Sequence, residues 1–491
     1  MTLAERGKVG LFGIGLAAYW PQFKGLKRRL EGYQRVVNGH LDKFCDVVDA
    51  GLVDSAPAAA AAGAMFSREG VELVICYVGT YATSSQVLPA VQQVGAPVLI
   101  LNLQPVSALD YPKTDTGEWL ANCCSCCVPE IACAFARSRI DFQVVTGVLG
   151  VERGRFREAP PSHPDSQRAW QEIESWVRAA SVVSQLKRSR IGFLGQTYPG
   201  MLDMYSDFTQ HTAQLGTHIE VLEMCDLAQR LPKASERAVA AKRREALAIF
   251  DVSEDSPSDP LARAPKPAQM EWACRVAVAL DRLVADFDLH GLAYHYRGLA
   301  GNEYERLGAG LILGCSLLTA RGIPASGEGD LKNCQAMKIL DLLGCGGSYT
   351  EFYAMDFDED FLLMGHDGPF HLGIAEGKPI LRGLGLYHGK RGYGVSVEAH
   401  VKLGPVTLLA LTQTADGSLK LLVSEGESIP GAMLQIGNTN SRIKFQCGMT
   451  NFVNRWCSEG PTHHCSLGVG HVLPVVRRIG SLLKLPYVEV A

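Results

Sequence analysis

Short apolar runs separated by longer amphipathic stretches fill the first third of the chain. Lys8–Phe12, Val71–Val78 and Pro97–Asn102 are such runs, and a helical pattern covers 21–38. Continuous apolar strands between helices are typical of a parallel sheet that is covered on both faces. The pattern therefore predicts an N-terminal α/β domain over residues 1–186.

The same alternation begins again at Arg190–Gly195, after the polar connector Arg153–Asp165. A helical run around 200–215 and a strand over 218–224 follow, and Ser253–Pro267 has the composition of a solvated loop. Proline, serine and aspartate favour loops because they compete with regular backbone pairing. We predict a second, central α/β domain over residues 187–325.

The sequence pattern changes near residue 325, where glycines become frequent. Segments at 379–387, 393–401, 405–413 and 418–424 alternate like strands joined by turns, which indicates an antiparallel barrel or sandwich. The predicted fold class is therefore α/β, with two Rossmann-like parallel domains followed by a mostly antiparallel β domain over residues 326–491.

Composition narrows the class of protein. A net charge of −4 argues against nucleic acid or an anionic membrane as the main partner. No run of about 18 apolar residues is present, so no membrane-spanning helix is expected. The 15 cysteines are scattered through core-like segments and no secretion signal precedes them. Reduced thiols in a cytoplasmic protein are the expectation.

One N-terminal motif suggests a cofactor. Gly13-x-Gly15-x-x-Ala18 after the first strand has the spacing of a dinucleotide-binding turn. The acidic residue expected about 20 positions later is not evident, and Trp20 and Pro21 add bulk where the helix should begin. A glycine-rich strand-to-helix turn is preferred, and an NAD-linked oxidoreductase is the lesser alternative.

A second N-terminal motif contains four cysteines, at 123, 124, 126 and 127. Its two overlapping C-x-x-C pairs are of the type that binds zinc or an iron–sulfur cluster. Both pairs lie within five residues, however, so a single ion cannot easily use all four thiols. A buried or substrate-proximal role is therefore favoured over a metal site.

The strongest chemical signal is a set of carboxylates and imidazoles in the last third of the chain. Glu328 lies in Gly-Glu-Gly-Asp, Glu351 follows a Gly-Gly turn, His366 lies in Gly-His-Asp-Gly-Pro, and His463–His464 follow Gly-Pro-Thr. These are ligands that a divalent metal uses, placed in loops bounded by glycine. If the loops converge, they form a metal site.

These motifs resemble the L-arabinose isomerase family, within the wider L-fucose/L-arabinose isomerase superfamily. Gly327–Asp330 and the helix expected after it are similar to the family's Gly-Glu-Gly-Asp loop and helix. Gly346–Glu351 resembles its Gly-Gly-Thr-Ser-Phe-x-Glu segment, and Leu363–His366 its Gly-Ser/Gly-His stretch. Thr462–His464 resembles its Ala-His-His.

The resemblance implies a metal-dependent aldose–ketose isomerase that acts on a pentose, hexose or deoxy sugar through a cis-enediol(ate). Glu328, Glu351, His366 and His464 would be the metal ligands, and the two glutamates the acid/base pair. The metal implied is Mn²⁺, with Co²⁺ or Mg²⁺ as alternatives. A non-catalytic sugar-binding or regulatory relative is the alternative function.

The resemblance also implies a sugar-binding set of Tyr19 and His463. Cys123 and Cys126 stand where the family has a glutamine and a histidine that contact sugar. The sugar therefore need not be L-arabinose. Family members form hexamers or related homo-oligomers in which a neighbour's N-terminal domain completes each site, and the same is expected here.

Overall fold

The structure is a computed structural model that describes residues 6–254, 259, 261–296, 301–384 and 393–490. The chain forms two compact units that divide between Ser184 and Gln185, and helix α5 (Pro164–Arg188) continues through the boundary. Within these ranges, no helix combines the length and the apolar character that crossing a bilayer requires.

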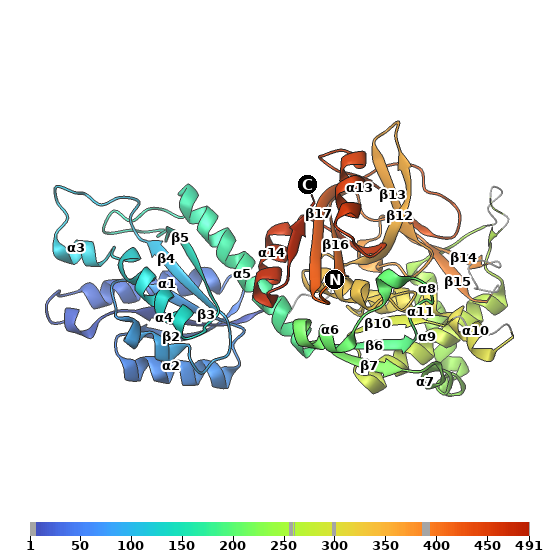
Figure 1. Cartoon of the computed structure of the whole chain (residues 1–491), viewed down its shortest axis with the longest axis horizontal. Coiled ribbons are helices and arrows are strands. Elements are labelled where there is room, and N and C mark those ends of the chain that lie inside the picture. Colours follow the sequence, from blue (N-terminus) through green and yellow to red (C-terminus); the bar gives the residue numbers. More distant parts are fainter. Residues whose placement is uncertain (1–5, 255–258, 260, 297–300, 385–392, 491) are drawn as a thin grey trace. The chain divides into compact units, whose positions relative to one another are not determined.

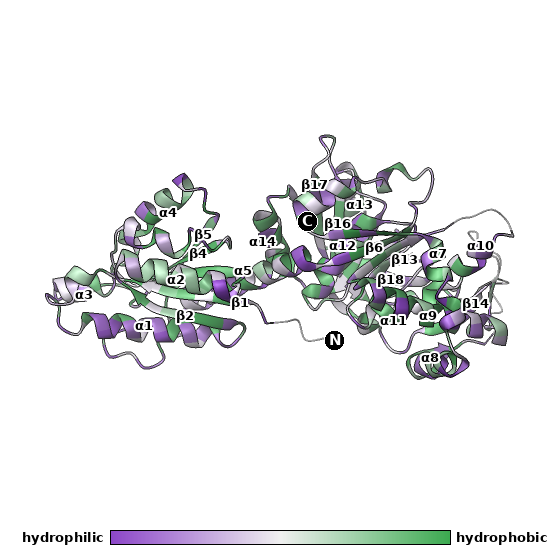
Figure 2. Ribbon diagram, turned by 90° about the horizontal axis from the view of Figure 1, so that it is seen from below, coloured by the Kyte–Doolittle hydropathy of each residue, from purple (hydrophilic) through white to green (hydrophobic). Residues whose placement is uncertain are grey.

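The N-terminal unit is built on a five-stranded parallel sheet in the order β2-β1-β3-β4-β5 (Figure 1). Its strands are β1 (Lys8–Ile14), β2 (Asp46–Val53), β3 (Leu73–Val78), β4 (Val98–Gln104) and β5 (Phe142–Val148). Figure 2 shows its inner strands largely as hydrophobic, as expected for strands covered on both faces. The strand order reverses between β1 and β3, and open parallel sheets bind ligands beyond the carboxyl ends of strands at such a point.

Helices cover this sheet. Apolar residues of α2 (Ala56–Glu69) and α4 (Val128–Arg137) pack against β1, β3 and β4 in one core. Helix α1 (Leu26–Leu41) meets α5 through His40 and Trp170, whose rings stack with centroids 4.3 Å apart. The core of this unit thus fixes the loops that leave the carboxyl ends of the strands.

The second unit begins with a four-stranded parallel sheet in the order β11-β10-β6-β7. Its strands are β6 (Arg190–Gly195), β7 (His218–Leu222), β10 (Gly291–His295) and β11 (Ala325–Ser326). Apolar residues of α9 (Pro267–Phe287) and α11 (Leu311–Thr319) form one core with β6, β7 and β10. The loop from β11 into α12 (Leu331–Leu342) carries Glu328.

This unit also contains a barrel of antiparallel strands. The strands are β12 (Ser348–Asp356), β13 (Phe361–His366), β16 (Gly404–Gln413), β17 (Leu419–Ile429), β18 (Thr439–Lys444) and β19 (His464–Val469). They pair antiparallel in the order β16-β19-β12-β13-β18-β17, and β17 pairs back with β16, which closes the ring. Strand β20 (Tyr487–Glu489) adds to β17 in parallel. Helix α12 contacts both β10 of the parallel sheet and β16 and β19 of the barrel, and most of its side chains are buried.

A small sheet lies beside these layers. Strand β14 (Ile380–Leu384) pairs with β15 (Val395–Glu398), β8 (Asp251–Val252) and β9 (Ala262–Arg263). The predicted strand over 379–387 matches β14 as far as Leu384, and its remaining residues lie outside the described ranges. The expected loop over 253–267 lies partly outside them too, and its described part contains β9.

The predicted fold class is confirmed, with two parallel sheets followed by a mostly antiparallel one. The closed ring of strands decides for the barrel over the sandwich. Residues 187–325 and 326–491 pack within one compact unit, so the division into three domains stays a prediction.

Candidate metal and active site

Glu328 lies on a tight loop with unusual backbone geometry. Its φ is +59°, and Gly329 after it has a φ of +68°. A side-chain-bearing residue rarely adopts the left-handed region, and such residues gather at functional sites where the surroundings hold them in place. Here the Glu328 carbonyl accepts a hydrogen bond from the Tyr198 N–H at 2.8 Å. The loop therefore presents the Glu328 carboxylate in a fixed direction.

The barrel register brings the other members of the set together. Glu351 on β12 pairs with His464 on β19 and with Gly365 on β13. Residues directly opposite each other in an antiparallel pair place their side chains on the same face. His366 follows Gly365, and its N–H donates to Thr439 Oγ1 at 2.9 Å. The register thus places Glu351 and His464 on one face, and His366, the last residue of β13, meets them where its strand ends.

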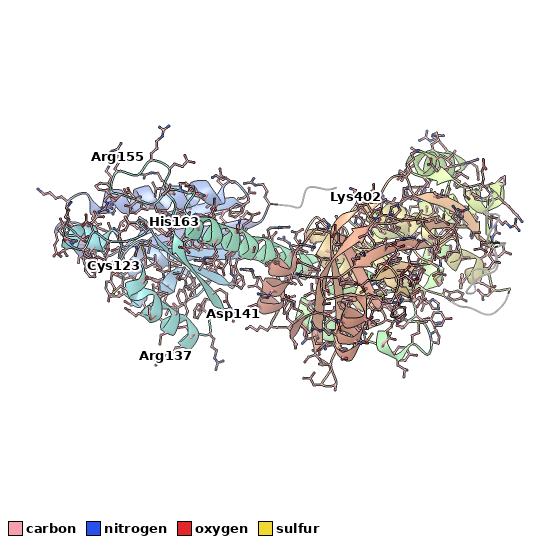
Figure 3. All side chains as sticks on the ribbon, turned by 90° about the horizontal axis from the view of Figure 1, so that it is seen from above. Cys123, Arg137, Asp141, Arg155, His163 and Lys402 are labelled. Atoms are coloured by element: carbon pink, nitrogen blue, oxygen red, sulfur yellow. The ribbon has the colours of Figure 1, made fainter. Side chains whose placement is uncertain are left out.

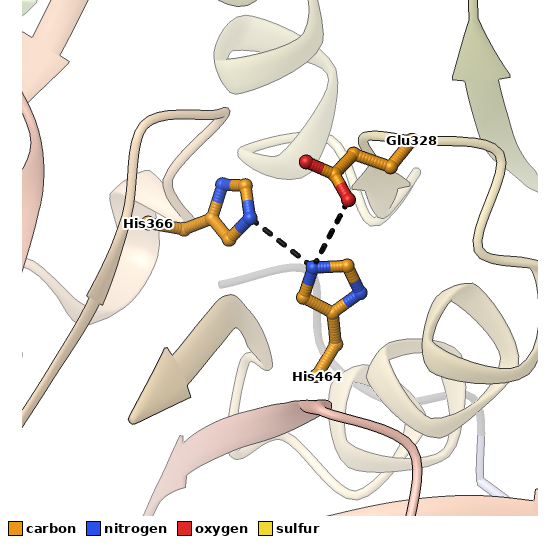
Figure 4. A group of neighbouring side chains, drawn as sticks. All are labelled: Glu328, His366 and His464. Carbon is orange, nitrogen blue, oxygen red and sulfur yellow. Dashed lines mark hydrogen bonds and ion pairs between the residues drawn. The ribbon is translucent and has the colours of Figure 1, made fainter. Parts of the chain in front are cut away.

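The imidazoles of His366 and His464 meet the Glu328 carboxylate (Figure 4). The two Nε2 atoms are 3.2 Å apart, and His464 Nε2 is 3.6 Å from Glu328 Oε2. His366 Nε2 is 4.0 Å from Glu351 Oε1. One ligand atom from each of Glu328, His366 and His464 lies within 4.8 Å of the others, and the same holds for Glu351, His463 and His464.

A second carboxylate lies near the Nδ1 atom of each imidazole. His464 Nδ1 donates to Asp330 Oδ2 at 2.9 Å, and both side chains are fully buried. His366 Nδ1 is 3.2 Å from Asp367 Oδ1, but within the described structure it makes no hydrogen bond. Because the Asp330 carboxylate only accepts, it draws the His464 ring proton to Nδ1 and leaves the lone pair on Nε2, as in metal-bound histidines. Both Nε2 atoms face the centre of the set.

Charge and burial in this cluster suit a cation. Burial alone would raise the pKa of the Glu328 carboxyl, but the imidazoles of His463, His464 and His366 outweigh it and hold the pKa below its usual value. Glu328 Oε2 is buried, and none of the described residues gives it a hydrogen bond. Two nitrogen ligands at right angles, each roughly 2.1 Å from an ion, would be roughly 3 Å apart, close to the separation of the Nε2 atoms. The residues therefore fit a divalent metal.

His463 is held differently from its neighbour. Its backbone N–H and its Nδ1 both donate to Asp203 Oδ2, at 2.9 Å and 2.6 Å. Its Nε2 is 3.8 Å from Glu328 Oε2. Burial would lower the pKa of His463, but the carboxylates of Asp203 and Glu328 raise it to about 10. His463 is thus a cationic neighbour of the cluster.

Tyr349 is a further member that the sequence motifs do not single out. Its side chain is fully buried, its ring centroid is 4.0 Å from that of His366, and its hydroxyl is 2.8 Å from His464 Nε2. It precedes Glu351 by two residues on β12, so strand alternation places both on the same face. That alternation is the only sequence signal for Tyr349. Asp330 was visible inside the Gly-Glu-Gly-Asp motif.

Tyr19, Cys123 and Cys126 lie in the other unit, where Figure 3 labels Cys123. Tyr19 ends a 3-10 turn after β1, and the cysteines lie between β4 and α4. Burial, Cys123 and Tyr81 together raise the pKa of Tyr19, which shows that these groups are neighbours. Cys124 and Cys127 are buried and Cys126 is exposed. Both three-residue ligand groups found among the described residues belong to the second unit, away from these cysteines in sequence.

Comparison with known proteins finds sugar isomerases among the similar chains. The chain is 23% identical over 332 residues to a sulfoquinovose isomerase of Alkalicoccus urumqiensis, covering 67% of this chain and 71% of that one. It is 20% identical over 445 residues to an L-arabinose isomerase of Aeromonas salmonicida, covering 86% and 81%. An L-arabinose isomerase of Aeromonas hydrophila is 19% identical, over 85% and 80% of the two chains. No family model matches.

The chain is a divergent member of this isomerase family. The activity expected from the motifs, that of an aldose–ketose isomerase, is supported by these relatives.

Proposed function

We propose that the chain is a divalent-metal-dependent aldose–ketose isomerase with Glu328 and Glu351 as its acid/base pair. The observation that carries the proposal is the convergence of Glu328, His366 and His464, whose ligand atoms lie within 4.8 Å of one another. Glu351 joins through His366 and His464. The chemistry of the set, carboxylate oxygen and imidazole nitrogen, favours Mn²⁺, with Co²⁺ or Mg²⁺ as alternatives.

The reaction moves a proton between C1 and C2 of the sugar and hydrogen between O1 and O2. A bound divalent ion supplies charge that polarises the carbonyl and stabilises the enediolate oxygens. One carboxylate removes the proton from carbon and the other serves the oxygens, in the manner of a general base and a general acid. The lowered pKa of Glu328 keeps it ionised at neutral pH, as a base requires.

The sugar-contacting residues are part of the proposal. Tyr19, Cys123 and Cys126 follow β1 and β4 of the N-terminal sheet, whose order reverses between β1 and β3. Ligands of open parallel sheets bind beyond the carboxyl ends of the strands at such a point. We propose that these residues, with His463, select the sugar, and that the chain is a homo-oligomer as the resemblance implies.

A screen identifies the sugar and tests the activity. The purified chain, supplied with Mn²⁺, is offered L-arabinose, sulfoquinovose and a panel of other pentoses, hexoses and deoxy sugars, with ketose formation as the readout. Turnover of at least one sugar that is abolished by a chelator and restored by Mn²⁺ is expected. Full turnover in excess chelator would contradict the metal-dependent mechanism.

Substitution tests the acid/base pair. Glu328→Gln and Glu351→Gln should each lower kcat by about 10²- to 10⁴-fold, the usual contribution of a general acid or base. Glu427→Gln, at an exposed position on the barrel strand β17, is the matched control and should leave kcat unchanged. Circular dichroism checks that all three variants are folded. Retained activity in both site variants would exclude the assignment.

A further inference from the structure

Asp203 reaches the cluster from a distant part of the chain. It lies on the 3-10 turn η5 (Leu202–Met204), which follows β6, whereas His463 immediately precedes β19 of the barrel. A single oxygen, Asp203 Oδ2, accepts from both the His463 N–H and its Nδ1, at 2.9 Å and 2.6 Å. Because one oxygen binds both the ring and the backbone of His463, it fixes the position and the orientation of the imidazole.

The turn that carries Asp203 is itself anchored. The ammonium group of Lys332 donates to the Tyr205 carbonyl and to Ser206 Oγ, both at 3.2 Å. Lys332 is fully buried in the first turn of α12, two residues after Asp330. Asp203 therefore belongs to a segment tied to the helix that supports the candidate metal ligands. A residue on such a support can hold its neighbour in place.

The fixed ring leaves one atom available. His463 Nε2 is 3.8 Å from Glu328 Oε2, which is too far for a hydrogen bond. The His463 side chain is 35% exposed, so an oxygen atom roughly 2.8 Å from Nε2 can form a hydrogen bond with it. A sugar hydroxyl has this chemistry.

We propose that Asp203 is a positioning residue that holds His463 so that a sugar hydroxyl binds at His463 Nε2. The inference rests on the proposed function, because it assumes that the cluster binds a sugar. It assigns Asp203 to substrate affinity rather than to metal binding. Asp203 bonds to His463 and to no member of the group Glu328, His366 and His464.

Two variants test this role. Asp203→Ala removes both hydrogen bonds, and Asp203→Asn keeps one acceptor oxygen, so the effect should be graded. Freeing the ring and weakening its contact with the hydroxyl should raise KM for the sugar found in the screen about tenfold in Asp203→Ala, with kcat changed less than threefold. Binding of the corresponding alditol, which lacks the reacting carbonyl, should weaken by the same factor in calorimetry. Mn²⁺ affinity should stay within about twofold.

The control is Asp207→Asn, four residues away. Asp207 caps α6 (Phe208–Leu215) by accepting from Thr209 N–H at 2.8 Å, and in the described structure no hydrogen bond or ion pair joins its carboxylate to His463. It should leave KM and alditol binding unchanged. Unchanged alditol binding in both Asp203 variants would overturn the inference, as would an equal loss of Mn²⁺ and alditol binding. A wild-type chain that binds no Mn²⁺ or turns over no sugar would overturn the proposed function, and this inference with it.

Discussion

Replacing Asp330 by Asn should weaken metal binding while leaving the helix cap in place. Each carboxylate oxygen of Asp330 has its own role. Oδ1 caps α12 by accepting from the Asn333 N–H at 2.9 Å, and Oδ2 accepts from His464 Nδ1 at 2.9 Å. Asparagine caps helices about as well as aspartate, so its oxygen keeps the first bond. Its NH₂ group then faces His464 Nδ1. The imidazole proton is driven to Nε2, the atom that faces His366 and Glu328.

The size of the effect follows from the same contact. His464 and Asp330 are fully buried, and a hydrogen bond to a charged group contributes about 1.5–3 kcal/mol. At about 1.4 kcal/mol for each factor of ten, its loss predicts an affinity for Mn²⁺ that falls roughly 10- to 100-fold. Loss of a partner behind a metal-binding histidine typically has an effect of this size.

Calorimetric titration with Mn²⁺ at neutral pH measures this change. Asp115→Asn is the matched control, because Asp115 caps α3 (Thr116–Leu120) by accepting from the Glu118 N–H at 2.8 Å, the same spacing along the chain. Among the described residues no imidazole hydrogen-bonds to Asp115, so this variant should bind Mn²⁺ like the wild type. An Asp330→Asn variant whose Kd stays within about twofold of the wild type would refute the reasoning.

Three further predictions concern stability. Burial lowers the pKa of His211 to about 4, below the value of about 6.5 expected in the unfolded chain, so the folded state binds fewer protons between these values. The free energy of unfolding should therefore fall by as much as about 3 kcal/mol as the pH drops from 6.5 to 4. Urea denaturation at a series of pH values measures this, and the same pH dependence in His211→Gln would contradict it. Arg382 and Glu398 form a buried ion pair with two hydrogen bonds, of 2.6 and 2.8 Å. Arg382→Met leaves the Glu398 charge buried and unpaired, so it should lower the free energy of unfolding in urea by about 3–5 kcal/mol. Combining it with Glu398→Leu should restore most of that stability. Mn²⁺ at 100 times its Kd should stabilise the fold by about 2.7 kcal/mol over chelator-treated protein, whereas equal melting temperatures would count against a site in the native state.

Local patterns predicted the fold class well because parallel strands are short apolar runs with clear flanks. The run Arg190–Gly195 is β6 as predicted, and the helix expected at 21–38 is present as Leu26–Leu41. The sequence does not distinguish a barrel from a sandwich, because the pairing of β16 with both β17 and β19 depends on contacts far apart in sequence. Sequence alternation reports which face a residue lies on, and it does not report which strand lies beside it.

The same distinction explains which site residues the sequence supplies. Glu328, Glu351, His366 and His464 lie in glycine-bounded loops or at strand ends, where composition marks them. Asp203 has no such mark: it lies 260 positions from His463 in a segment of ordinary composition, and only the packing of the parallel sheet beside the barrel joins them.

The candidate ligands and the residues that orient them come from one compact unit. Asp330 begins α12, Lys332 in its first turn holds the segment that carries Asp203, and α12 contacts both the parallel sheet and the barrel. A helix in this position couples the geometry of Glu328 to that of His464, because the loop before it carries one and a strand that it contacts carries the other. The metal-binding end is therefore a property of a rigid core. Tyr19, Cys123 and Cys126, which we propose to select the sugar, lie on loops of a separate unit, so sequence change there leaves the candidate ligand set in place.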